Sequence, residues 1–297
     1  MKRTEPTFSG LFIIVPTRNR AQLARLSIQS ATRHSGLDVR ILVSDNSTNP
    51  AEQTQLETYC KLLPGDAHVS YIRPPHSMPM AEHWNWALKQ ALHRTQAEHF
   101  AILTDRFILR HGSLSKLIHV LTQYPDHILV YGIDSVHDHT SPCRVSLGRS
   151  TDRLYWIDSS RLLEDTSRLH SLSFIPVLLN SVTTRTSLES VRSTFGDYCV
   201  SIAPDYAHGF RTLATQSTIL YLDSYLSTNW GRLRSNGMSH TRGVDNSDST
   251  DYRASFENGL VYSATPVPKA LLTNNAIAHE YVTVQQSRSG LGMPPLD

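Results

Sequence analysis

The sequence predicts an α/β fold in which a mostly parallel central sheet is covered by helices on both faces. Short apolar runs alternate with amphipathic segments through the first half of the chain, as in strand–helix–strand units. The run at residues 11–15 is continuously apolar, which indicates a buried strand. Asp105 comes just after another such run, where open α/β sheets bind their ligands.

Five apolar runs in the first half predict strands. Pro16 ends the first run, and the turn-forming sequence Asp45-Asn46-Ser47 ends the second. The fourth run leads into Thr104 and Asp105. The expected strands cover residues 11–15, 39–44, 69–72, 99–103 and 128–131.

The segments between these strands carry apolar residues at helical spacing. Pro79 suits the first turn of the third helix, and Ser113 is expected to cap the fourth. The expected helices cover residues 21–34, 50–62, 80–92 and 113–124.

Parallel strands place all their strand-to-helix loops at one edge of the sheet. The loops at Pro16, Asp45 and Asp105 are therefore expected to converge in space despite their distance in the sequence. This convergence is the main structural prediction.

The alternating pattern weakens between residue 135 and about residue 185. Further along, residues 205–215 have the spacing of a helix, and residues 217–222 are typical of a strand. Residues 227–258 are rich in Ser, Asn, Gly, Arg and Asp, so they are expected to form a functional lid or to be partly disordered.

The composition limits the classes of protein to consider. The chain has 297 residues, of which 39% are hydrophobic and 18% charged, as in a globular protein. The length suits one large α/β domain, or one domain with a C-terminal extension. A net charge of +2 and the lack of a basic run exclude nucleic acid as an expected partner.

Cysteine usage and the N-terminal residues bear on location. Cys60, Cys143 and Cys199 are widely spaced, which fits neither a metal site nor a disulfide framework and favours a reducing compartment. The apolar run at residues 11–15 is too short for a signal peptide core or a membrane span. A cytoplasmic protein without a transmembrane segment is expected, and peripheral membrane contact through a loop stays open.

Glycine-rich phosphate loops of the dehydrogenase and NTPase types are missing from the sequence, which argues against both classes. Instead, six segments taken in order resemble family 2 glycosyltransferases with the GT-A fold. The family's first strand and loop are resembled by Ile13-Ile14-Val15-Pro16-Thr17-Arg18. Its acidic metal motif belongs at the position of Leu103-Thr104-Asp105-Arg106. The six segments are residues 13–20, 43–47, 80–88, 103–106, 204–206 and 235–237.

This resemblance implies transfer of a sugar from a nucleotide-sugar donor to a hydroxyl of a glycan or glycolipid acceptor, usually with inversion. It places Asp45 against the nucleobase, Asp105 against the ribose or a diphosphate-bound cation, and Asp205 as the general base. The residues expected to bind the donor are Pro16, Thr17, Arg18, Asp45, Asn85, Asp105 and Arg106. The candidates for a lid over the diphosphate are Arg232, Arg234 and His240.

The resemblance also implies an organisation in two halves of one domain. Residues 8–134 are expected to form the nucleotide-sugar-binding half. Residues 135–297 are expected to form the acceptor-side half, together with a C-terminal loop or extension.

One departure from the family pattern concerns the cofactor. Arg106 stands where the family usually has a second acidic residue for Mg²⁺ or Mn²⁺, and an adjacent arginine repels such a cation. Asp105 could hold the metal alone, with water and phosphate oxygens completing the shell. Alternatively, Arg106 could itself bind the phosphates in a bidentate manner, or it could turn away into a salt bridge.

The site residues also have purely structural interpretations. Asp45 can form an Asx-turn, Asp205 can cap a helix, and Asn85 can bridge loops without touching a ligand. Arg18 and Arg20 can be solvated loop charges.

Two other functions fit the same pattern less well. One is a catalytically degenerate GT-A-fold protein that binds a glycan or a protein. The other is a sugar-1-phosphate nucleotidylyltransferase, against which the missing glycine-rich, lysine-containing N-terminal loop counts.

Overall fold

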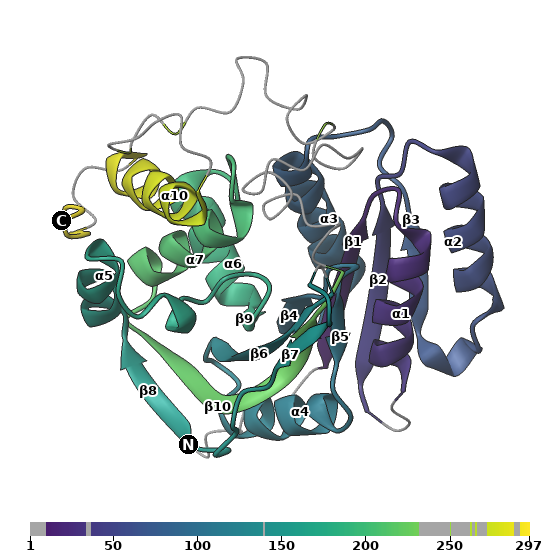
Figure 1. The fold of residues 1–297 in the computed structure, drawn as a ribbon, viewed down its shortest axis with the longest axis horizontal. Coiled ribbons are helices and arrows are strands. Elements are labelled where there is room, and N and C mark those ends of the chain that lie inside the picture. Colours follow the sequence, from purple (N-terminus) through teal and green to yellow (C-terminus); the bar gives the residue numbers. More distant parts are fainter. Residues whose placement is uncertain are drawn as a thin grey trace, which may run out of the picture.

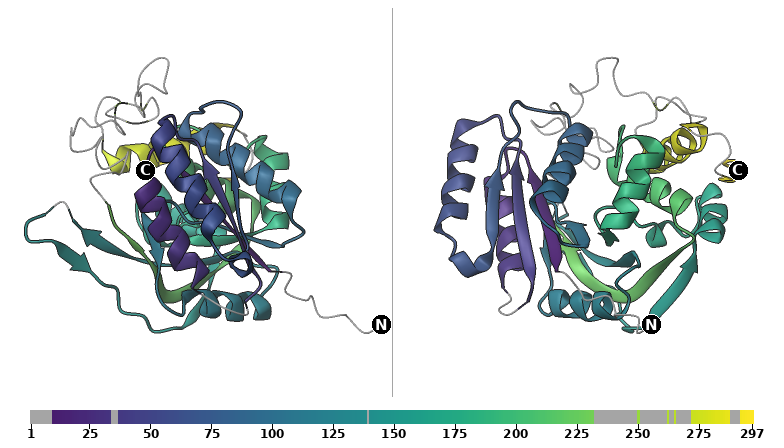
Figure 2. Two further views of the ribbon diagram at one scale, coloured as in Figure 1. Left: turned by 90° about the vertical axis from the view of Figure 1, so that its right-hand side faces the viewer. Right: turned by 180° about the vertical axis from the view of Figure 1, so that it is seen from behind.

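Ten strands of the described residues form one sheet, and helices cover both of its faces (Figures 1 and 2). The computed structural model describes residues 10–33, 37–138, 140–231, 250, 262, 265, 272–287 and 292–297. The α/β fold predicted from the sequence is confirmed.

The strands run in the order β3-β2-β1-β4-β9-β6-β10-β5, with β7 beside β6 and β8 beside β10. The first four strands in this order are parallel, whereas β9, β7, β8 and β5 pair antiparallel. The strands are β1 (Leu11–Thr17), β2 (Val39–Asp45), β3 (Val69–Ile72), β4 (His99–Ile102), β5 (Phe107–Leu109), β6 (Leu129–His137), β7 (Arg144–Ser146), β8 (Leu154–Asp158), β9 (Ser181–Thr184) and β10 (Thr218–Asn229).

The helices divide between the two faces because successive side chains of a strand point in opposite directions. In β1, Ile13 belongs to the core under α1, α2 and α4, whereas Ile14 packs with α3 and α6. A third core lies between β6, β10 and the helices α5, α7 and α10. The helices are α1 (Ala21–Thr32), α2 (Pro50–Leu62), α3 (Met80–Arg94), α4 (Ser113–Gln123), α5 (Ser159–Ser167), α6 (Arg185–Phe195), α7 (Pro204–Thr215) and α10 (Thr273–Ser287).

The predicted elements of the first half are present. The bounds of α2 and β3 agree with the prediction, whereas β1 and β2 extend by two residues and one residue to Thr17 and Asp45. Elements at β5, β7, β8, β9, α5, α6 and α10 were not predicted. The strand expected at residues 217–222 runs on to Asn229, so it includes the first three residues of the expected lid segment.

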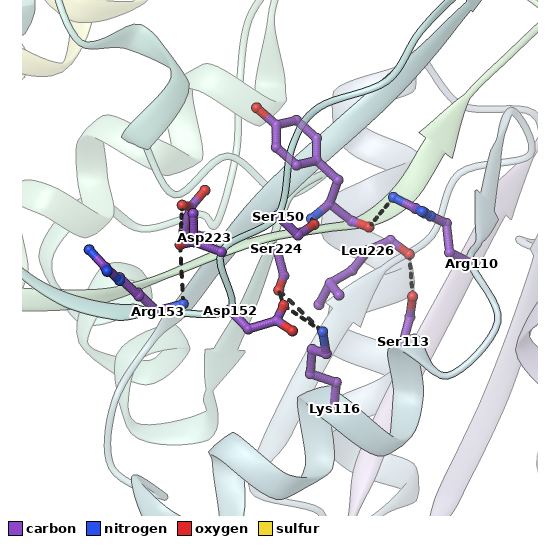
Figure 3. Close-up of polar contacts among 11 residues, drawn as sticks. Arg110, Ser113, Lys116, Ser150, Asp152, Arg153, Asp223, Ser224 and Leu226 are labelled. Carbon is purple, nitrogen blue, oxygen red and sulfur yellow. Dashed lines mark hydrogen bonds and ion pairs between the residues drawn. The ribbon is translucent and has the colours of Figure 1, made fainter.

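Ser113 does not cap α4, contrary to the prediction. The cap position is Gly112, whose φ of 78° favours glycine. The Ser113 hydroxyl instead donates to the Leu226 carbonyl at 2.6 Å (Figure 3). The serine therefore ties the start of α4 to β10, a contact between residues far apart in the sequence.

Further polar contacts fix the irregular part of β10 (Figure 3). The register of β10 against β6 shifts between Leu222 and Tyr225. Between these two residues, Ser224 contacts Asp152, which also accepts a 2.6 Å bond from Lys116 of α4. These contacts hold β10 between α4 and the loop before β8. The strand then continues to Asn229, which lies at the candidate site.

Of the helices described, none is both long and apolar enough to cross a lipid bilayer.

Candidate active site

The three distant loops meet at one edge of the sheet, as predicted. Thr17 ends β1 and is the register partner of Asp45, which ends β2. The Thr17 hydroxyl donates to Asp105 Oδ2 at 2.8 Å, across 88 positions of sequence. Asp45 and Asp105 therefore flank the same strand end, at the edge where parallel α/β sheets bind ligands.

The partner of Asp105 is Arg20, a residue that the sequence analysis did not assign to the site. Arg20 immediately precedes α1, and its Nη1 lies 3.4 Å from Asp105 Oδ1. Both side chains are largely buried, with 11% and 4% of their surface exposed. Arg20 lies between β1 and α1, at the edge where the loops were expected to converge. That position is the feature of the sequence from which its place in the site could have been predicted.

Arg106 turns toward the second half of the sheet. Its Nη1 donates to Asn229 Oδ1 at 3.1 Å, and its carbonyl accepts from Trp230 N at 3.0 Å. Burial raises the pKa of Asp205, and the positive charge of Arg106 opposes part of that rise. The arginine thus links the Asp105 loop, the end of β10 and the Asp205 region.

Asp205 occupies the first turn of α7 but does not cap it. The cap position is Ala203, and Pro204 opens the helix, so the capping interpretation of Asp205 is wrong. Burial raises the pKa of Asp205 to about 6, although backbone N–H groups and Arg106 oppose the rise. A half-buried carboxyl with such a pKa is suited to accept a proton near neutral pH.

Asp45 is completely buried, and both of its oxygens accept hydrogen bonds. Oδ1 accepts from Ser47 N at 2.9 Å, which is the Asx-turn considered from the sequence. Oδ2 accepts from the Tyr71 hydroxyl at 2.7 Å. Burial, followed by the bond to Asp45, raises the pKa of Tyr71, so this phenol remains a donor. The sequence analysis missed Tyr71, and contact of Asp45 with a nucleobase stays a prediction.

Residues that follow β1 and β2 form hydrogen bonds with the loop before α3. Asn46 Nδ2 donates to the Met78 carbonyl at 2.7 Å, and Asn46 Oδ1 accepts from Met78 N at 3.0 Å. Arg18 Nη1 donates to the same carbonyl at 3.1 Å. Arg18, and Pro16 near the end of β1, therefore lie at the expected edge, and their roles toward a donor stay predictions.

Asn85 links α3 to the segment between α6 and α7. Its Oδ1 accepts from the backbone N–H groups of Tyr198 and Cys199 at 2.9 and 3.2 Å, and its Nδ2 donates to the Cys199 carbonyl. The side chain is buried in α3. These contacts are structural, but they join a helix to one segment and do not bridge loops. Donor binding by Asn85 stays a prediction.

Replacing Asn85 with Ala is expected to lower the free energy of unfolding by about 1–3 kcal/mol, because buried backbone groups lose their partners. Urea denaturation measures the change. Lys89→Ala on the same helix removes a half-exposed ion pair to Asp197 and is expected to cost about 0–1 kcal/mol. Equal losses in the two variants would contradict this assignment.

The residues around Asp105 do not fit a divalent cation. No group of three His, Cys, Asp or Glu side chains that could bind a metal occurs within the described part of the chain. The two oxygens of Asp105 face a hydroxyl donor and a guanidinium, whereas Mg²⁺ and Mn²⁺ need several oxygen ligands. The positive charge at this carboxylate is supplied by Arg20. The lid candidates Arg232, Arg234 and His240 lie outside the described residues.

Polar side chains at the carboxyl ends of parallel strands, with a carboxyl of raised pKa nearby, define an α/β enzyme site. Comparison with known proteins gives the family. The model of glycosyl transferase family 2 matches residues 12–177, more than half of the chain. The chain therefore belongs to glycosyl transferase family 2 and is a glycosyltransferase with the GT-A fold.

Solved structures with the same fold are distant in sequence. Residues 1–349 of TarS from S. aureus share 11% identity with this chain at a TM-score of 0.56, covering 95% of this chain and 73% of that chain. GalNAc-T7, solved with UDP, GalNAc and Mn²⁺, shares 12% identity at a TM-score of 0.54, covering 75% and 43%. Against the longer TarS structure, the chain spans 41% of that protein's length. None of the curated protein sequences matches this chain significantly.

Proposed function

We propose that this glycosyltransferase moves a sugar, with inversion, from a uridine diphosphate sugar to a hydroxyl of a glycan or glycolipid during polysaccharide synthesis. The observation that carries the proposal is Asp205, a half-buried carboxyl with a pKa of about 6 beside the positively charged Arg106. TarS was solved with UDP-GlcNAc and with UDP, which supports a uridine nucleotide. The three free cysteines support a cytoplasmic location.

Asp205 acts as the general base in this proposal. The carboxylate takes the proton of the acceptor hydroxyl as that oxygen attacks the anomeric carbon. Attack from the face opposite the leaving diphosphate inverts the configuration through an oxocarbenium-like transition state. A base with a pKa near 6 is mostly ionised at neutral pH and still accepts a proton in the transition state.

Arg20 and Arg106 stabilise the departing diphosphate. Negative charge develops on the leaving group, and fixed positive groups in a site with little water stabilise it most. The Asp105 carboxylate, which also accepts from the Thr17 hydroxyl, holds Arg20 in place, and Asn229 holds Arg106. Guanidinium groups bind phosphate oxygens in a bidentate manner.

Release of UDP from a panel of UDP-sugars, with a glycan or glycolipid acceptor present, tests the function directly. Anomeric configuration of the product, read by NMR, tests inversion. Donor binding without turnover on a broad acceptor panel would favour the degenerate binding protein instead.

Asp45→Ala is expected to weaken binding of UDP, because the carboxylate and its Tyr71 partner shape the wall proposed for the nucleobase. Thermal shift provides the measurement, since a ligand at about a hundred times its Kd adds roughly 2.7 kcal/mol of apparent stability. Asp66→Ala, in the short helix before β3, serves as the control. Unchanged UDP affinity in Asp45→Ala would remove Asp45 from the nucleotide site.

A further inference from the structure

Glu280, on the helix α10, contacts the segment that begins α7. Its Oε1 accepts from Ile202 N at 2.9 Å and from Ala203 N at 2.8 Å. The side chain is completely buried, and 77 positions of sequence separate it from Ala203. Asp205 lies two residues beyond Ala203, so Glu280 fixes the backbone from which the proposed base projects.

The two helices also pack through apolar side chains. The rings of Phe210 on α7 and Tyr281 on α10 meet edge to face, with centroids 5.2 Å apart. Figures 1 and 2 show α10 lying against α7. Glu280 neighbours Tyr281, so the same docked helix supplies both the packing and the polar contact to the start of α7.

The charge state of Glu280 follows from this buried position. Burial raises the pKa of Glu280 to about 8, the two backbone N–H groups lower it, and the negative charge of Asp205 raises it further. Glu280 is therefore largely neutral when Asp205 is ionised at neutral pH. The titratable groups that face Glu280 are Asp205 and Arg211 on α7, Cys199 before it, Tyr262, and the adjacent His279 on α10.

We propose that Glu280 is a positioning residue that holds Asp205 in place while it is neutral and releases the start of α7 when it ionises. The proposal rests on the proposed function for its catalytic consequence. Its structural consequence stands alone. Ionisation would place a negative charge in a buried site beside Asp205. The two backbone N–H groups and Arg211 compensate this charge only in part, so it disfavours docking of α10 on α7.

The sign of the pH dependence follows from proton linkage. The folded-state pKa of Glu280, about 8, lies above its ordinary value of 4.5. The folded state therefore holds this proton more tightly than the unfolded state does. The stabilising contribution is complete below pH 4.5, declines as the pH rises above it, and is lost by the time the pH has passed through 8.

Glu280→Gln separates charge from geometry, because the amide oxygen still accepts both N–H bonds but cannot ionise. In the wild type, kcat/KM is expected to fall as the pH rises through about 8, whereas Glu280→Gln is expected to stay level there. The two proteins are expected to share the limb near pH 6 that belongs to Asp205. The melting temperature of the wild type is expected to drop relative to Glu280→Gln over the same alkaline range.

Two further variants complete the test. Glu164→Gln, which neutralises an exposed acid on α5, is the control and is expected to follow the wild type at every pH. Glu280→Ala removes the acceptor and is expected to lower kcat roughly a hundredfold with little change in KM for the donor, since misplacement of a base affects the chemical step.

Parallel melting and activity profiles for the wild type and Glu280→Gln would overturn the proposal. Failure of the proposed function gives a different result. If no UDP-sugar is turned over, or if Asp205→Asn remains active, the base assignment fails while the melting comparison still decides the role of Glu280. If Glu280→Ala does not fold, the Glu280→Gln comparison remains decisive.

Discussion

Asp205→Asn is expected to reduce kcat by about 10²–10⁴-fold while leaving donor affinity near that of the wild type. The amide keeps the size of the side chain but cannot accept the proton of the acceptor hydroxyl. Since Asp205 does not cap α7, the change is expected to leave the helix intact. Stopped assays of UDP release give kcat, and thermal shift with UDP reports donor binding.

The pH dependence of the wild type provides an independent check of this base. Burial raises the pKa of Asp205 to about 6, so kcat/KM is expected to rise with pH through that value as the carboxyl loses its proton. Asp197→Asn serves as a matched control, because this acid precedes α7 and makes a half-exposed ion pair with Lys89. Full activity of Asp205→Asn would assign the base to another group.

Arg20→Met is expected to lower kcat by about 10²–10³-fold, because the charge at Asp105 that would stabilise the leaving diphosphate is lost. The variant also leaves a nearly buried carboxylate without its ion partner, so a loss of stability is expected as well. Arg20→Lys restores a positive charge without the planar guanidinium and is expected to recover stability more fully than kcat.

Chelation with EDTA tests whether Arg20, and not a metal ion, supplies the positive charge at Asp105. Among the described residues, no group of three potential metal ligands includes Asp105, whose oxygens face Thr17 and Arg20 instead. Activity is therefore expected to change little in EDTA. For the Arg20 variants, Arg25→Ala on the following helix α1, which removes a cation stacked on the ring of Tyr59, controls for general effects of losing an arginine from this region. Complete loss of activity in EDTA, restored by Mn²⁺, would contradict the assignment of the charge to Arg20.

The fold of the first half could be predicted because its signals are local. The apolar runs at β1 and β2 and the helical spacing in α2 and α3 each lie within about fifteen residues. The strands of the second half were harder to predict. β7 is a short, exposed strand without an apolar pattern, and β8 carries an apolar run whose Tyr155 and Trp156 are exposed. Their formation depends on pairing with β6 and β10, which the sequence does not show.

The site was predicted only as far as topology allowed. Parallel strands had to bring Thr17, Asp45 and Asp105 to one edge, and the structure has them there. Arg20 was not assigned to the site, because Arg106 follows Asp105 in sequence whereas Arg20 contacts it in space. Donor binding by Arg106 stays a prediction. Sequence proximity favoured Arg106, whereas the direction of each side chain depends on the completed fold.

The sequence by itself determined the alternation of strands and helices, the edge where polar residues gather, and the kind of chemistry that their side chains permit. The tertiary structure decided which groups share that edge and which of them are charged. Glu280 illustrates the difference, since nothing near it in the sequence links it to Asp205. Burial and long-range contacts set the pKa values of both carboxyls, and these exist only after α10 has docked on α7.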